Sequence, residues 1–240
     1  MHQQYIEWER QMKNIKQLLV KLFTTQRKYF EENGERIFID SNQIDFNKFD
    51  MYQKNHFRRY EFAENIISSD DIVGDFACGT GYGTILLANK AKKVIGIDIN
   101  AKIVREIKKK YNTTKNAEFL QSNLLDIKYS NIFDKIISFE TVEHLDPENI
   151  PALFKSFSSA LKPKGMLIFS VPYKQDDSEI ALKMGHHKTF HIDEDKISIW
   201  LGLSSFELET IYYQNYKSHE IVPSLSEKDF IICICRNTKI

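Results

Sequence analysis

Three glycines follow a short apolar run, and an acidic residue follows the next such run. Gly79, Gly81 and Gly83 stand in residues 72–88, IVGDFACGTGYGTILLA. Glycines let a backbone turn sharply and approach a ligand closely, and the helix start beyond them favours anionic groups. Asp98 follows Gly81 by 17 residues, in VIGID, where a carboxylate can accept hydrogen bonds from both ribose hydroxyls of a nucleoside. These residues predict a nucleoside-containing cofactor, and by themselves they fit NAD as well.

A second group of polar residues lies in ETVEHL, which begins at Glu140 and directly follows the fourth apolar run. Ligands of open α/β sheets bind at the carboxyl ends of the strands, which is where this group falls. His144 is therefore a candidate general base for an acceptor hydroxyl, worth about 10²- to 10⁴-fold in rate, with Glu143 beside it. The alternative is a histidine that is hydrogen-bonded within a loop.

Short apolar runs alternate with helical stretches from residue 72 onward, which is typical of βαβ units and a parallel sheet. The chain is therefore expected to be an α/β protein. The predicted strands cover residues 72–76, 93–97, 117–120, 133–138, 166–171, 206–213 and 229–236, and the predicted helices cover 83–89, 101–111, 151–161 and 193–201.

The first 30 residues carry large apolar side chains at spacings of three and four, which predicts an amphipathic helix. We expect this arm to pack over the core; a lid on the active site and a dimer seam are the alternatives. Residues 35–55 lack a clear period and are expected to be a connecting segment. The predicted organisation is an N-terminal arm, residues 1–54, followed by a cofactor-binding domain, residues 55–240.

The composition limits the function classes. Lys plus Arg and Asp plus Glu each total 33 among 240 residues, so no excess of one charge draws the protein to nucleic acid or to an anionic membrane. The N-terminus lacks the apolar core of a signal peptide, and no run of 18 apolar residues occurs. We therefore expect a cytoplasmic protein that has no membrane partner. The three cysteines are expected to be reduced core thiols.

Five motifs occur in order along the chain: DFACGTGYG, GID, NLLD, FDKIISFETVEHL and LKPKG. Together they resemble class I S-adenosylmethionine-dependent methyltransferases, and in particular bacterial small-molecule and glycan-associated members. The resemblance implies a doubly wound, mostly parallel seven-stranded sheet, the Rossmann-like methyltransferase fold, here with an N-terminal helical arm. One departure is Ala77, which stands where many members have the first glycine, and we expect its single methyl group to be tolerated.

The resemblance implies a site for S-adenosylmethionine, with S-adenosylhomocysteine as its product. Asp75 would hold the methionine amino group, sometimes through water, and Asp98 would bind the ribose. Arg59, in HFRRYEFA, would contact the cofactor carboxylate. The alternative is that the arginines only form a solvated, charged face of a helix, and this alternative applies more to Arg58 than to Arg59. The implied cofactor-binding residues are Arg59, Tyr60, Asp75, Ala77, Gly79 and Gly81, then Asp98 and Ile99, Asn123 and Leu124 beside adenine, and Phe139 near the sulfonium.

The expected reaction is methyl transfer to a hydroxyl or amine of a small polar acceptor, such as a sugar or a phosphorylated metabolite. Two alternatives remain, because Glu140, Glu143 and His144 with a histidine of GHHKTFH resemble the metal ligands of small-RNA 2′-O-methyltransferases and of some quinone-pathway O-methyltransferases. We expect no metal, since relatives without metal carry the same ExxEH motif. A binding protein that kept the fold and lost activity is a further alternative.

Overall fold

The computed structural model describes residues 36–41 and 44–239. All of these except Arg36 belong to one compact unit, Ile37–Ile240. The predicted N-terminal helix, and with it the dimer seam, lies outside the described residues. The predicted division at residues 54 and 55 stays a prediction; both residues lie in one helix, α2 (Met51–Ile66).

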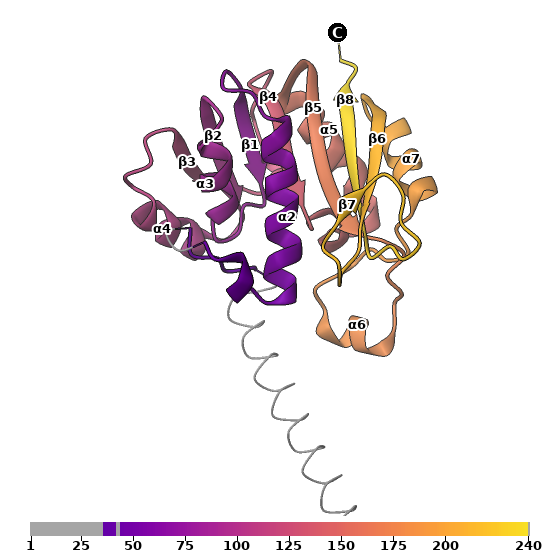
Figure 1. The fold of residues 1–240 in the computed structure, drawn as a ribbon. Coiled ribbons are helices and arrows are strands. Elements are labelled where there is room, and N and C mark those ends of the chain that lie inside the picture. The colour runs from indigo at the N-terminus through magenta and orange to yellow at the C-terminus, as the bar shows by residue number, and fades with distance from the viewer. Residues whose placement is uncertain (1–35, 42–43, 240) are drawn as a thin grey trace, which may run out of the picture. The chain divides into compact units, whose positions relative to one another are not determined.

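A mixed sheet forms the centre of this unit (Figure 1). Its order is β3-β2-β1-β4-β5-β8-β6-β7. Strands β1 to β5 are parallel, and β8 runs antiparallel to both β5 and β6. The strands are β1 (Ile72–Phe76), β2 (Lys93–Asp98), β3 (Ala117–Gln121), β4 (Phe133–Phe139), β5 (Leu161–Pro172), β6 (Phe206–Gln214), β7 (Ile221–Val222) and β8 (Phe230–Asn237).

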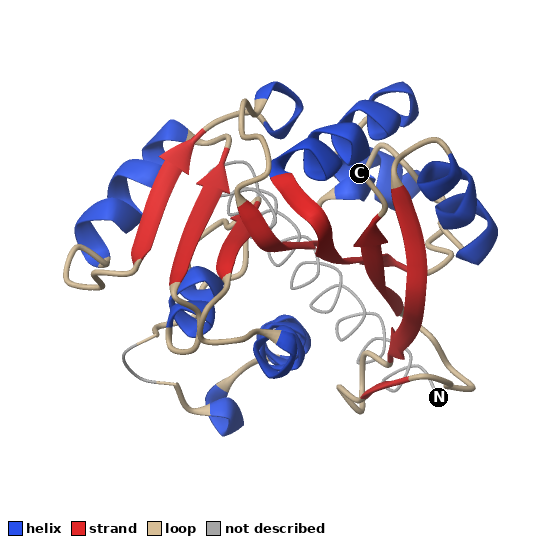
Figure 2. Ribbon diagram, turned by 90° about the horizontal axis from the view of Figure 1, so that it is seen from above, coloured by secondary structure: helices blue, strands red, loops and turns tan. Residues whose placement is uncertain are grey.

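Helices lie on both sides of the strands (Figure 2). Helix α2 begins with a capping box, in which the Asp50 side chain accepts from the Gln53 N–H while the Gln53 side chain accepts from the Asp50 N–H. The other helices are α3 (Tyr82–Ala88), α4 (Ala101–Lys110), α5 (Ile150–Ala160), α6 (Glu179–Met184) and α7 (Glu194–Gly202). Short 3₁₀ turns are η1 (Phe46–Lys48), η2 (Leu124–Asp126), η3 (Val142–His144) and η4 (Pro147–Asn149).

Alternate residues of the strands pack into different cores. Ile137 and Ile168 join the cluster that also contains residues of α2 and α3. Ile136 and Leu167 join the cluster that contains residues of α5 and α7. A strand covered on both faces needs apolar side chains at successive positions, which explains the Ile136–Ile137 pair. The core therefore fixes β1, β4 and β5, whose carboxyl ends carry the candidate site.

The predicted fold class is confirmed, but the expected number of seven strands is wrong. The described residues form eight strands, because β7 adds two residues beside β6, pairing Tyr213 with Val222 and Gln214 with Ile221. So short a strand leaves no alternating pattern in a sequence. None of the helices in residues 36–41 and 44–239 is long and apolar enough to cross a membrane.

Candidate active site

The glycine turn joins β1 to α3 in left-handed backbone conformations. The φ angles are 63° at Ala77, 52° at Gly79 and 75° at Gly81. The turn is fixed by the Cys78 N–H, which donates to the Ile97 carbonyl oxygen at 2.9 Å, and by the Gly81 N–H, which donates to Cys78. Glycine adopts such angles without strain, whereas alanine does so at a cost of about 1 kcal/mol or more. The cost of Ala77 therefore lies in its backbone angle.

Asp98 connects the end of β2 to the glycine turn. Its Oδ2 accepts a hydrogen bond from the Gly79 N–H at 3.0 Å, and its Oδ1 accepts one from the Asn100 N–H at 2.8 Å. Its side chain is buried, while the next residue, Ile99, is 61% exposed. The carboxylate predicted to bind a ribose is thus in direct contact with the glycine turn.

Asp75 is a fully buried carboxyl at the end of β1. Its Oδ1 accepts from the Tyr60 hydroxyl at 2.9 Å, and its Oδ2 accepts from the Thr84 hydroxyl at 2.6 Å. Burial raises the pKa of Asp75 to about 6, although both hydrogen bonds oppose that rise. The predicted contact of Asp75 with the cofactor amino group stays a prediction.

Gly83 is required by Tyr60, which lies directly against the first turn of α3. A Cβ at this position would overlap the Tyr60 ring. The same ring lies edge-on to Phe139, with ring centroids 5.2 Å apart. Tyr60 therefore links α2, the glycine turn and the end of β4.

Asn123 and Leu124 follow β3 at the same edge of the sheet. The Asn123 side chain caps η2 by accepting from the Leu125 N–H at 3.0 Å. Leu124 is buried, and its carbonyl oxygen accepts from the Ser156 hydroxyl of α5. The structure thus places both residues at the carboxyl edge, and their contact with adenine stays a prediction.

Arg59 is a buried cation of α2. Its Nε donates to the Gln214 side-chain oxygen at 2.8 Å, and its Nη1 lies 3.2 Å from Glu140 Oε1. Its guanidinium lies 4.1 Å from the centroid of the Phe230 ring. Arg58, by contrast, is exposed and pairs with Glu61 at 2.7 Å. The proposed contact between Arg59 and the cofactor carboxylate stays a prediction.

Glu140 follows β4 with a φ of 50°, in the left-handed region. Its Oε1 accepts from the Ser170 hydroxyl at 2.7 Å and forms the ion pair with Arg59. Its N–H donates to the Ser170 carbonyl oxygen at 3.1 Å. The strained backbone is held by these contacts, which turn the chain sharply out of the sheet toward η3.

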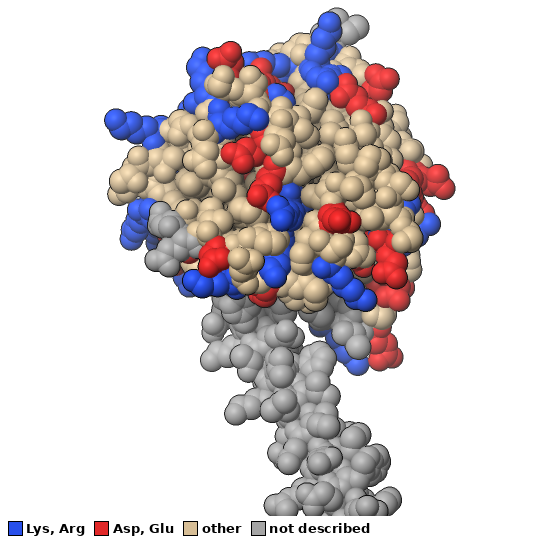
Figure 3. Space-filling model, viewed as in Figure 1, with Lys and Arg blue, Asp and Glu red and all other residues tan. Residues whose placement is uncertain are grey.

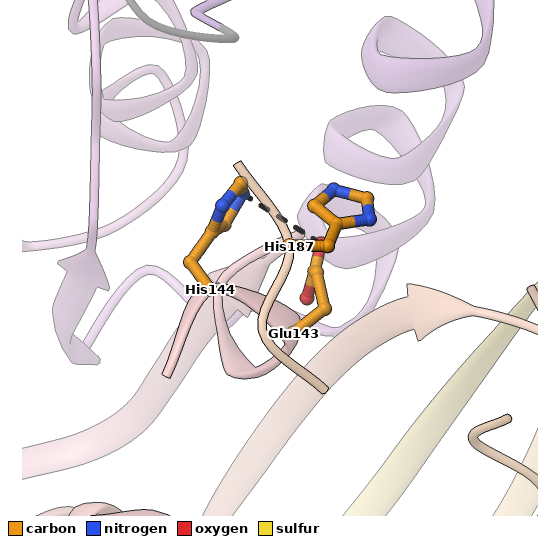
Figure 4. Close-up of side chains that lie close together, drawn as sticks. All are labelled: Glu143, His144 and His187. Atoms are coloured by element: carbon orange, nitrogen blue, oxygen red, sulfur yellow. Dashed lines mark ion pairs between the residues drawn. The ribbon is translucent and has the colours of Figure 1, made fainter. Parts of the chain in front are cut away.

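Three side chains with metal-binding or proton-transfer chemistry meet just beyond β4 (Figure 4). Glu143 and His144 belong to η3, and His187 comes from the segment after α6. Glu143 is fully buried, and its Oε1 lies 4.0 Å from His144 Nε2. The rings of His144 and His187 are edge-on, with centroids 4.9 Å apart. Of the three histidines in GHHKTFH, His187 is the one whose ring joins His144 and Glu143, whereas His186 contacts His144 through its carbonyl oxygen.

Some residues of the site region were not predicted. Thr84 and Gln175 are among them, as is the hydrogen bond between His56 Nδ1 and the Tyr82 hydroxyl. Burial and the nearby charge of Arg59 lower the pKa of His56 to about 3, so its ring is neutral. No local pattern marks these residues, because each bonds to a side chain of another element and such a pair leaves no periodic signal in the sequence.

The first comparison with known proteins is a match of residues 73–165 to a model of the methyltransferase domain. YqeM of Bacillus subtilis (strain 168), whose name describes it as an inferred methyltransferase, is 31% identical over 146 residues, covering 59% of this chain and 58% of that protein. Thiocyanate methyltransferase 1 of Arabidopsis thaliana is 27% identical over 138 residues, covering 51% of this chain and 60% of that protein. The chain thus spans about six-tenths of the length of these relatives.

The second comparison is with solved structures. The N-methyltransferase NodS from Bradyrhizobium japonicum, solved with S-adenosyl-L-homocysteine, superposes with a TM-score of 0.61 at 14% identity, covering 81% of this chain and 91% of that one. At this identity the likeness shows the fold, which is the Rossmann-like fold of methyltransferases. The domain match and the curated relatives show that the chain is similar to methyltransferases, and its fold is that of the class I S-adenosylmethionine-dependent members.

Proposed function

We propose that this protein transfers the methyl group of S-adenosylmethionine to a hydroxyl or amine of a small polar acceptor. The observation that carries the proposal is the contact of Asp98 with Gly79, at the same sheet edge as Phe139 and His144. In the proposed site, Asp98 would bind the ribose of the cofactor and the glycine turn would lie beside the rest of it. His144, at the same edge of the sheet, would face the acceptor.

The residues on the cofactor side fit such a ligand. The left-handed turn at Gly79 and Gly81 leaves one face without a Cβ, Asp98 supplies carboxylate oxygens, and Ile99 offers an exposed apolar side chain for a base. Asp75 supplies negative charge for an amino group, and the Tyr60 hydroxyl donates to it. These residues would bind and orient the cofactor.

When bound, the cofactor supplies a methyl group already activated by positively charged sulfur. The protein mainly positions the reactants, which can contribute roughly 7 to 11 kcal/mol to lowering the barrier. Phe139, held against Tyr60, is buried at the end of β4 and helps to exclude water there. On this side of the site the chain needs no nucleophile of its own.

On the acceptor side, His144 and Glu143 are the proposed catalytic residues. The Nδ1 of His144 lies 2.9 Å from the His186 carbonyl oxygen, which can only accept, so Nδ1 carries the proton and Nε2 has the lone pair. Nε2 can therefore receive a proton from an acceptor hydroxyl. Glu143, 4.0 Å from this nitrogen, would stabilise the charge that forms.

Charge supports a small acceptor over RNA. On the face drawn in Figure 3, basic and acidic side chains are interspersed. The whole chain has a formal net charge of zero. Nucleic-acid binding depends on clustered Lys and Arg, so we propose a sugar or phosphorylated metabolite as acceptor and keep RNA and quinone-pathway acceptors as the alternatives.

We also propose a cytoplasmic location, in keeping with the lack of a membrane-crossing helix among the described residues. A homodimer formed through the N-terminal helix is a prediction of the sequence alone, since that segment lies outside the described residues.

Calorimetric titration with S-adenosylhomocysteine, beside NAD, tests the cofactor. We expect binding of S-adenosylhomocysteine alone; binding of NAD instead would overturn the proposal. Sugars, phosphorylated metabolites, amines and short RNAs are then compared as acceptors by the S-adenosylhomocysteine that forms. With an active acceptor, His144→Gln should slow methylation of a hydroxyl by 10²- to 10⁴-fold. Unchanged turnover in His144→Gln would indicate a nitrogen acceptor.

A further inference from the structure

Each of the two histidines beyond β4 has its Nδ1 against a protein oxygen. His144 Nδ1 donates to the His186 carbonyl oxygen at 2.9 Å, and His187 Nδ1 donates to the Gln175 side-chain oxygen at 2.6 Å. In each neutral ring, Nε2 then has the lone pair. Histidines that bind a metal nearly always donate their other ring N–H to an oxygen in this way, which fixes the ring and raises its basicity.

Glu143 supplies a carboxylate that the fold holds next to both rings. Its side chain is fully buried. Its backbone carbonyl oxygen accepts from the N–H groups of Lys188 and Thr189, at 2.8 and 3.0 Å, and so ties the segment that carries His187 to η3. One ligand atom from each of Glu143, His144 and His187 lies within 4.8 Å of the others.

We propose that Glu143, His144 and His187 bind one divalent transition-metal ion. Ligand atoms at about 2.0 to 2.2 Å from such an ion are roughly 3 to 3.5 Å apart, so small side-chain rotations close the present site. Two imidazoles and one carboxylate suit Zn²⁺, Co²⁺ or Mn²⁺ better than Mg²⁺, which prefers oxygen ligands. Three protein ligands leave a coordination position for an acceptor oxygen.

Glu140 is not part of this ligand set. Its Oε1 is held by Arg59 and by the Ser170 hydroxyl. The site therefore differs from the set that the sequence suggested, which combined Glu140 with Glu143 and His144. Glu140 instead fixes the turn that delivers η3 to the sheet edge.

The inference deepens the proposed function and rests on it for its role in catalysis. An ion at this site would lower the pKa of an acceptor hydroxyl. The acceptor oxygen forms the new bond to the methyl carbon, the carbon–sulfur electron pair stays on sulfur, and the hydroxyl proton leaves to water. His144 would then act as a metal ligand and not as the base, and a loss of methylation in His144→Gln would result from the loss of the metal.

Titration of the untagged full chain with Co²⁺, with and without S-adenosylhomocysteine, tests the site by calorimetry and by visible absorption. We expect one Co²⁺ per chain, displaced by Zn²⁺ and not by equimolar Mg²⁺. His187→Ala and Glu143→Gln should each weaken Co²⁺ binding at least 10-fold. Gln175→Ala, which removes only the partner of His187, should weaken it about 10- to 100-fold.

The matched control is His191→Ala, in the same segment. His191 is exposed and pairs with Asp177 at 3.1 Å, so its loss should leave Co²⁺ binding unchanged. S-adenosylhomocysteine binding by each variant shows that the fold is intact. The inference is overturned if the wild-type chain binds no Co²⁺, or if His187→Ala and Glu143→Gln bind it as well as wild type. Failure of the wild type to bind S-adenosylhomocysteine would instead contradict the proposed function.

Discussion

At the scale of single residues, the candidate site depends on polar groups buried with their partners. Asp75 takes hydrogen bonds from Tyr60 and Thr84 and lies in the core without exposure to water. Removing a carboxylate from water disfavours its charged form. The cost appears as a raised pKa, so Asp75 connects the stability of the fold to pH.

The first prediction concerns Asp75 and the pH dependence of stability. Its pKa rises from 3.8 to about 6 on folding, so the folded chain holds this proton more tightly than the unfolded chain does. The resulting stability is fully present below about pH 4 and is lost as pH rises through about 6. Asp75→Asn removes this loss, which is at most roughly 3 kcal/mol. Denaturant unfolding should show that the free energy of unfolding of the variant, relative to wild type, is higher at pH 7 than at pH 4. The same difference between the two proteins at both pH values would contradict the pKa shift.

The second prediction concerns Gly83 and the Tyr60 ring. Gly83→Ala adds a Cβ that overlaps this ring, so we expect a loss of about 1 to 3 kcal/mol in the free energy of unfolding, and weaker S-adenosylhomocysteine binding. Gly202→Ala is the control, since a Cβ there meets nothing within 4 Å. Urea unfolding and calorimetry measure the two effects. Equal behaviour of the two variants would mean that Tyr60 moves away at no cost.

Local patterns predicted some site residues and missed others. Gly79 and Asp98 were predicted because a glycine turn and an acidic strand end are recognisable one by one. Which of three histidines meets His144 depends on how the chain packs after α6, and the sequence around His187 does not contain that information. Thr84 was missed for a similar reason, since its partner Asp75 lies across the turn.

At the scale of elements, α2 is the helix that the sequence analysis did not predict: its first residues, 51–55, fell in the expected connecting segment, and residues 56–66 were assigned to no element. It buries polar residues, Asn55 and Arg59, as well as apolar ones, so its apolar spacing is weak. Their partners lie at the far edge of the fold: the Asn55 side chain donates to the Tyr216 carbonyl oxygen, and Arg59 donates to Gln214. The parallel strands were easier to predict, because each is a short run rich in apolar residues, such as Val94–Ile95 in β2 and Ile136–Ile137 in β4.

Strand β5 shows a different limit of the pattern. It begins at Leu161, five residues before its predicted start at Met166, because Pro163 and Gly165 normally mark a loop. The structure shows a register irregularity between Phe133 and Lys135 in the pairing of β4 with β5. Tertiary pairing thus extended a strand through residues that disfavour one.

The third prediction tests the attachment of α2 to the sheet. Gln214→Ala leaves the buried Arg59 Nε without its acceptor, which should cost about 1 to 3 kcal/mol of unfolding free energy. Arg58→Ala, one residue along the same helix, removes an exposed ion pair and should change stability by less than about 0.5 kcal/mol. Urea denaturation measures both. If Gln214→Ala lost no more unfolding free energy than Arg58→Ala, the ion pair with Glu140 alone would be enough to stabilise the buried Arg59.

At the scale of the whole described unit, the sheet collects at one edge the residues that follow β1 to β4. The proposed site therefore draws on segments that follow four strands, from the glycine turn to Phe139. A ligand that binds the folded chain alone stabilises it by RT ln(1 + [L]/Kd), whichever residues it touches. The shift in global unfolding is thus a direct measure of whether, and how tightly, the folded chain binds the ligand.

The last prediction uses that linkage. At a concentration 100 times its Kd, S-adenosylhomocysteine should add about 2.7 kcal/mol to the free energy of unfolding, and raise the Tm by roughly 5 to 10 °C. Asp98→Asn keeps the size of the side chain but loses the charge that accepts from ribose hydroxyls, so its Tm shift should be much smaller at the same ligand concentration. Asp70→Asn, an exposed change in the turn before β1, should keep the full shift. Equal shifts in both variants would remove Asp98 from the cofactor site, whereas no shift in the wild type would remove the cofactor itself.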